Sequence, residues 1–191
     1  MSDAHADMIR RIIAALAAVA LLGALTLAFL DDATHKPVPP QGDMLGTESG
    51  ESFVSYSERA RTSLLDAPID QHAYALVTFT GPLTPAEAGA VLDNVERVNA
   101  MIVQLAAPFP LPEPIAGEER ADVFQRELDR ISASLQGVGN VPSPGHLDAV
   151  VVRDNGNVLR LLSEAPQIAA IEVLPADAAW GRFGVRPVEV P

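Results

Sequence analysis

The chain has 191 residues, with 25 acidic and 13 basic side chains, a formal net charge of −12 at neutral pH, and no cysteine. The acid excess lies almost entirely beyond residue 30, and such a surface repels nucleic acid and anionic lipid headgroups. The lack of cysteine excludes disulfides, thiol redox chemistry, cysteine-based metal sites and cysteine-linked lipidation.

An uncharged apolar run, IIAALAAVALLGALTLAFL, occupies residues 12–30. As a helix rising about 1.5 Å per residue it is about 28 Å long, close to the ~30 Å hydrocarbon core of a bilayer, and it shows no polar face. Two arginines precede it and two aspartates follow it, so the positive-inside bias places the N-terminus in the cytoplasm. We expect a cytoplasmic tail at 1–11, one transmembrane helix at 12–30, and an extracytoplasmic remainder attached to the cell membrane.

A cleaved signal peptide is the competing interpretation, because it shares the arginine flank and an apolar segment. The run is longer than a usual signal-peptide core, and no A-x-A cleavage site stands immediately before Asp31. An anchor is therefore favoured, in contact with membrane lipid. Small residues within the run offer positions at which a partner helix could approach closely. The alternative interpretation is that they occur only because the whole run is apolar. They are Ala17, Gly23, Ala24 and Ala28.

Residues 31–50 contain three prolines, three glycines and scattered polar residues, a composition that predicts an extended stalk. Residues 51–175 are expected to form one α+β domain. Its first element is a short amphipathic helix that begins near Glu51, with Ser49 as a candidate cap, and ends before Pro68.

The next segments alternate between strand and helix patterns. A strand is predicted at 73–80 by the sequence AYALVTFT. A helix that reaches about residue 93 is predicted to follow, because Thr84-Pro85-Ala86-Glu87 provides a capping threonine, a proline at the first helical position and the glutamate of a capping box. Residues 95–105 predict a second strand. The four prolines within 106–117 predict a crossing without regular structure.

An apolar stripe predicts a helix over 118–135, and LDAVVVR at 147–153 predicts a third strand. Asp154-Asn155-Gly156 then allows either a hairpin turn into 158–162 or the cap of a helix over that range. The helix is favoured because the apolar residues there do not alternate. A fourth strand is expected over 168–174.

This order, βαβ, helix, βαβ, predicts a ferredoxin-like antiparallel sheet of four strands with helices on one face. The stretch VLRLLSEAPQIAAIEV at 158–173 resembles the end of the subtilisin propeptide-like inhibitor domain, in which a helix, a proline-containing turn and a final strand close the same kind of sheet.

The C-terminal segment, 176–191, contains the only tryptophan, together with another aromatic residue and two arginines. These residue types anchor protein interfaces. The segment either binds a partner or folds back onto the domain. The candidate partner-binding residues are Trp180, Arg182, Phe183 and Arg186.

No pattern in the chain assembles catalytic chemistry. The four histidines have no helical metal-ligand companion, no G-x-S-x-G motif is present, and the pair Glu118 and Glu119 is typical of a charged first helical turn. We therefore predict no catalytic, cofactor-binding or metal-ligating residue, and a protein that is not an enzyme.

The arginine-flanked span, the proline-rich stalk and the cysteine-free acidic domain together resemble small single-pass accessory subunits of the actinobacterial cytochrome bcc–aa3 respiratory supercomplex. The resemblance implies a structural role, with the span beside other transmembrane helices and the outward domain against another exposed subunit. A free-standing anchored binding or inhibitor-like module is the alternative, and an anchored hydrolase a further one.

Overall fold

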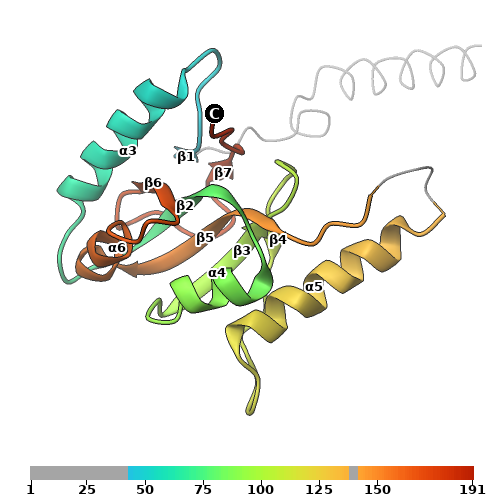
Figure 1. The fold of residues 1–191 in the computed structure, drawn as a ribbon. Helices are drawn as coiled ribbons and strands as arrows, with labels where there is room; N and C mark the ends of the chain where they lie inside the picture. Colours follow the sequence, from blue (N-terminus) through green and yellow to red (C-terminus); the bar gives the residue numbers. More distant parts are fainter. Residues whose placement is uncertain (1–42, 138–141) are drawn as a thin grey trace, which may run out of the picture. The chain divides into compact units, whose positions relative to one another are not determined.

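A five-stranded antiparallel sheet organises the part of the chain that the structure, a computed structural model, describes, namely residues 43–137 and 142–191 (Figure 1). In spatial order its strands are β4 (Phe109–Pro110), β3 (Arg97–Ile102), β5 (Leu147–Asn155), β2 (His72–Leu83) and β6 (Ile168–Val173). Successive side chains of a strand point to opposite faces. In β2, Ala75 and Val77 therefore enter one hydrophobic core, while Leu76 enters another.

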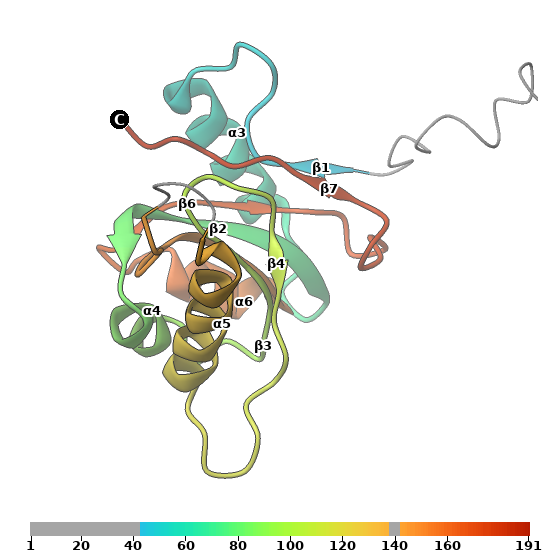
Figure 2. The same ribbon diagram turned by 90° about the vertical axis from the view of Figure 1, so that its right-hand side faces the viewer.

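Three helices cover the first face of the sheet (Figure 2). They are α4 (Pro85–Val91), α5 (Arg120–Leu135) and α6 (Gly156–Leu162). Each carries apolar side chains into the larger core, among them the fully buried Leu92, just after α4, Phe124 of α5 and Leu159 of α6. Burial of such side chains is the main force that holds these helices on the sheet.

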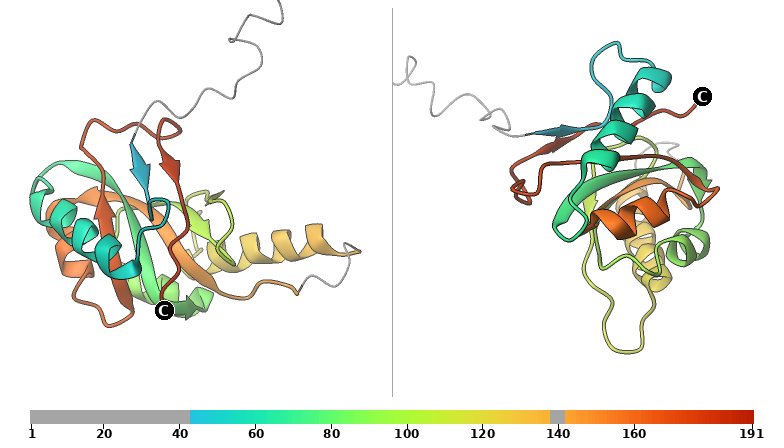
Figure 3. Two further views of the ribbon diagram at one scale, coloured as in Figure 1. Left: turned by 90° about the horizontal axis from the view of Figure 1, so that it is seen from above. Right: turned by 90° about the vertical axis from the view of Figure 1, so that its left-hand side faces the viewer.

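The second face is covered as well, by α3 (Phe53–Asp66) and by two short strands, β1 (Met44–Leu45) and β7 (Gly184–Val185), which pair in parallel (Figures 2 and 3). Tyr56 and Ala60 of α3 and Leu45 of β1 are fully buried there against the sheet. Helices were predicted on one face only. Tyr56 and Ala60 of α3 instead pack on the opposite face, and the helix contacts mainly β6, while Leu64 near its end joins the larger core.

Local capping signals identify the helices correctly. Thr84 caps α4, with Pro85 in its first turn and Glu87 completing the capping box. The side chain of Asn155 accepts hydrogen bonds from Asn157 and Val158 and caps α6, so the helix interpretation is confirmed and a hairpin there is excluded. Gly156 is required at this point because a Cβ would lie 2.5 Å from the carbonyl oxygen of Pro68.

Two local predictions need correction. The cap of α3 is Ser52, whose hydroxyl accepts from Ser55 N at 3.2 Å, and not Ser49. The proline-rich crossing contains the two-residue strand β4, which pairs with β3 at the edge of the sheet. Proline is tolerated there because an edge strand needs ladder hydrogen bonds on one side only.

The domain is also wider than the predicted 51–175. Residues 43–50, expected in the stalk, and the C-terminal segment belong to the same compact unit as the sheet. Their contact is a backbone ladder in which Gly184 N donates to Asp43 O and Arg186 N donates to Leu45 O. A pairing of residues 140 positions apart leaves no local sequence pattern.

The predicted cytoplasmic tail, transmembrane helix and most of the stalk lie outside the described residues. Within 43–137 and 142–191, no helix combines the length and the apolar character that crossing a bilayer requires.

Candidate functional site

The C-terminal segment turns back onto the second face of the sheet. Beyond β6, Leu174 N donates to Tyr74 O at 2.8 Å, which extends the pairing with β2 by one residue. Two tight turns follow, closed by hydrogen bonds from Ala178 to Pro175 and from Arg182 to Ala179, and β7 then joins β1. The segment is therefore part of the fold, and its side chains are placed by it.

Three aromatic rings, of Tyr74, Trp180 and Phe183, gather where this segment crosses β2, and we call them the aromatic cluster. The ring centroids are 5.8 Å apart for Tyr74 and Trp180, 5.1 Å for Tyr74 and Phe183, and 5.8 Å for Trp180 and Phe183. Tilted and edge-on pairs at these distances are favourable, by about 0.5–1.5 kcal/mol each. Phe183 also packs against the second core, whereas Trp180 keeps 43% of its surface exposed.

Arginine lies beside the exposed rings. Tyr74 is the cross-strand partner of Arg153, whose guanidinium carbon is 5.9 Å from the Tyr74 ring centroid, within the range of a cation–π contact. Arg182 is exposed between Trp180 and Phe183 in the chain. No carboxylate among the described residues forms an ion pair with either arginine. A protein with net charge −12 thus presents a local basic and aromatic surface.

The structure brings only some of the predicted partner-binding residues together. Trp180 and Phe183 lie in one cluster with Arg182 beside them in the chain. Arg186 lies directly after β7, and its backbone N–H donates to Leu45 O of β1, away from the three rings in the chain. Ala17, Gly23, Ala24 and Ala28 fall outside the described residues.

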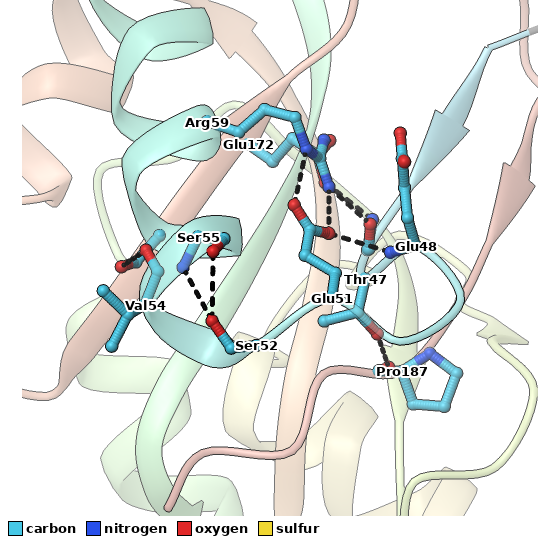
Figure 4. A network of polar contacts seen from close by, with 11 residues as sticks. Thr47, Glu48, Glu51, Ser52, Val54, Ser55, Arg59, Glu172 and Pro187 are labelled. Carbon is cyan, nitrogen blue, oxygen red and sulfur yellow. Dashed lines mark hydrogen bonds and ion pairs between the residues drawn. The ribbon is translucent and has the colours of Figure 1, made fainter.

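A polar network fixes the neighbouring segment, 46–51, to the sheet (Figure 4). Glu172 of β6, only 4% exposed, accepts a hydrogen bond from Gly46 N at 2.6 Å and forms an ion pair with Arg59 of α3. Arg59 also binds both carboxylate oxygens of Glu51, at 3.1 and 2.8 Å, and donates to Gly46 O at 3.0 Å. One guanidinium therefore joins α3, β6 and the residues that follow β1.

The two carboxylates of this network titrate differently. Burial raises the pKa of Glu172 above its ordinary value, and the hydrogen bonds from Gly46 and Arg59 offset only part of this effect. The hydrogen bond from Arg59, followed by that from Glu48 N, lowers the pKa of Glu51 to about 2. Glu51 is the stably ionised partner of Arg59.

A second side-chain cluster forms at the end of the sheet where β2 and β3 begin and β5 ends. His72, Glu96 and Asp154 place one donor atom each within 4.8 Å of the others. His72 Nε2 and Glu96 Oε2 are 2.6 Å apart, and the buried Asp154 accepts from the backbone N–H groups of Glu96 and Asn155, both at 2.7 Å. We call these three residues the histidine–carboxylate cluster.

The carboxylate pair considered for acid–base chemistry has structural partners instead. Glu118 forms an ion pair with Arg126, and Glu119 N donates to Asp122 at the start of α5. The hollow beside them, about 470 Å³ between α4 and α5, is lined by carboxylates, Arg120 and small residues. Burial lowers the pKa of Arg120, whose guanidinium donates to Val95 O at 2.7 Å. A serine, threonine or cysteine nucleophile is not among the lining residues.

Sequence reasoning missed Tyr74 and Arg153 of the aromatic surface, and it found no companion for His72. One signal was present: Arg153 is a charged residue at the end of the otherwise apolar run AVVV. The register of β2 on β5 decides that Arg153 faces Tyr74 and that Asp154 comes near His72, and it follows from burial over both whole strands, which no local motif records.

Comparison of the chain with protein-family models, with curated protein sequences and with solved structures finds no match.

Proposed function

We propose that this protein is a non-catalytic accessory subunit, anchored in the cell membrane by residues 12–30, which presents its domain outside the cytoplasm to another subunit of a membrane complex. The observation that carries the proposal is the aromatic cluster. Trp180 keeps 43% of its surface exposed and packs on Tyr74, which in turn contacts Arg153. Tryptophan, tyrosine and arginine are the residue types that dominate binding energy at protein interfaces.

The partner surface follows from this chemistry. Trp180 needs an apolar pocket, and Arg153 and Arg182 need carboxylates or backbone carbonyls around that pocket. The rest of the chain is acidic and would repel an acidic partner at longer range, so the contact depends on this local basic patch. We propose that the partner is an exposed subunit of a respiratory bcc–aa3 supercomplex, on the basis of the architecture and composition of the chain.

Affinity purification tests the proposal. The full chain, carrying a C-terminal tag, is expressed in an actinobacterium that contains the supercomplex and purified in mild detergent. Stoichiometric haem-containing subunits are expected with the unchanged chain, and we expect W180A to lose them. Recovery of the unchanged chain as a lone monomer would contradict the accessory role.

A matched control separates binding from folding. Leu161 of α6 is 61% exposed, and it belongs to the helix layer on the opposite face of the sheet from the aromatic cluster. L161A removes a comparable exposed apolar side chain, and we expect it to retain the partners. Equal loss of the partner subunits in W180A and L161A would contradict the proposed role of the aromatic cluster.

We also propose that the domain is ferredoxin-like. The four longer strands are, in chain order, β2, β3, β5 and β6. Their spatial order in the sheet is β3-β5-β2-β6, which is 2-3-1-4 when they are numbered along the chain, and all neighbours are antiparallel. This order is that of a split βαβ arrangement, with α4 and α6 as its connecting helices. An anchored inhibitor-like module built on this fold is the alternative function, for which inhibition of a subtilisin-type protease by the purified chain is the test.

A further inference from the structure

We propose that His72, Glu96 and Asp154 form a binding site for a divalent transition-metal ion, with Zn²⁺ as the best fit. This inference does not depend on the anchor or on partner binding. It concerns the end of the sheet where β2 and β3 begin and β5 ends (Figure 1). Three segments far apart in the sequence contribute one side chain each.

The topology of the sheet produces this convergence. β5 lies between β2 and β3 and is antiparallel to both, so its last residues meet their first residues. Asp154 pairs with Ala73, the neighbour of His72 in β2, and Arg153 pairs with Arg97, the neighbour of Glu96, so Asp154 lies close to both His72 and Glu96. The three donor atoms lie within 4.8 Å of one another. Two ligand atoms of one tetrahedral zinc ion lie about 3.3 Å apart, so binding requires the 2.6 Å contact between His72 Nε2 and Glu96 Oε2 to open slightly.

The donor set decides which ion is preferred. One imidazole nitrogen with two carboxylate oxygens suits Zn²⁺, which takes three protein ligands and leaves a fourth position to water in open sites. Mg²⁺ and Ca²⁺ favour oxygen ligands alone, and the imidazole disfavours them. The set contains no thiolate, so copper(I) is disfavoured too.

Asp154 is oriented as a metal-binding carboxylate normally is. Its Oδ1 accepts from Asn155 N at 2.7 Å and from Asn155 Nδ2 at 3.1 Å, and its Oδ2 accepts from Glu96 N at 2.7 Å. A carboxylate has about four acceptor positions, so Oδ2 keeps one open. Hydrogen bonds of this kind fix the direction of a ligand before the metal arrives.

Stability of the fold does not account for the other two side chains. The side chains of His72 and Glu96 are 35% and 60% exposed, and ion pairs this open contribute little because water screens them. Their 2.6 Å contact is a hydrogen bond in which a proton on Nε2 is donated to the carboxylate oxygen Oε2. A bound metal ion would take the place of that proton, which would pass to solvent.

Isothermal titration of the full chain with Zn²⁺ tests the site. The chain is purified in mild detergent with a histidine-free tag and stripped with a chelator. We expect one saturable Zn²⁺ site per chain, and we expect H72A and E96A each to weaken it by at least about ten-fold. These two side chains are partly exposed, so both variants should fold, which their unfolding temperatures without metal will check.

H146A is the matched control. His146 is an exposed histidine near Glu87, outside the cluster, and its removal should change Zn²⁺ affinity by less than about two-fold. Zn²⁺ should also raise the unfolding temperature of the unchanged chain and of H146A, but not that of H72A. Absence of saturable binding, equal binding by H72A, or equal affinity for Mg²⁺ or Ca²⁺ would each overturn the proposal.

Discussion

Removal of Glu172 should detach the segment before α3 from the sheet. In the folded chain this buried carboxylate accepts from Gly46 N and pairs with Arg59 (Figure 4). Glu172→Ala leaves the buried N–H of Gly46 without an acceptor, which costs about 1–3 kcal/mol. Arg59 keeps Glu51 and is 35% exposed, so its lost pairing adds only about 1 kcal/mol. We expect a total loss of about 2–4 kcal/mol in the free energy of unfolding.

Glu172→Gln separates the hydrogen bond from the charge. The amide oxygen can still accept from Gly46 N, so the cost should fall to about 1 kcal/mol. The folded-state pKa of Glu172 is raised, so folding favours its protonated form. That contribution is fully present below the unfolded-state pKa and is lost as pH rises through the folded-state pKa. The unchanged chain should therefore gain stability relative to Glu172→Gln as pH falls.

Urea titration of the full chain in mild detergent measures these changes. The single tryptophan, Trp180, packs on Tyr74 of the same domain, so its fluorescence reports unfolding of the domain rather than of an anchor. Glu58→Ala, an exposed carboxylate of α3 next to Arg59, is the control and should stay within about 0.5 kcal/mol. A change for Glu172→Ala as small as that of the control would refute the assigned role of the network.

Three further predictions concern the same domain. Gly46 has φ of +96°, and a Cβ there would lie 1.9 Å from Arg186 O, so Gly46→Ala should lower the free energy of unfolding by at least about 2 kcal/mol in urea titration. The control is Gly50→Ala, which should cost about 1 kcal/mol because Gly50 has φ of +79° but open space around it. Asn155→Ala removes the cap of α6 and should cost about 1 kcal/mol by the same measurement, with exposed Asn157→Ala near zero. The folded-state pKa of Glu51 is lowered from 4.5 to about 2. The difference in unfolding free energy between the unchanged chain and Glu51→Gln should therefore be constant above the unfolded-state pKa and vanish as pH falls to about 2. A difference that persists at that pH would contradict the pairing with Arg59.

The sequence by itself determined the elements that are encoded locally. Thr84, Pro85 and Glu87 mark the start of α4 through contacts within one turn, and Asn155 marks α6 in the same way. The alternation of strands and helices gave the α+β class. Each of these signals depends on neighbours a few residues apart, which a linear pattern records completely.

Tertiary structure alone decided which side chains meet. The pairing of Gly184 with Met44, of Arg59 with Glu172, and of His72 with Glu96 joins residues from separate elements through register and packing. Register follows from the summed burial of both sheet faces, and a shift by one residue would exchange those faces. The aromatic cluster and the histidine–carboxylate cluster exist only in that register, so no local pattern announces either of them.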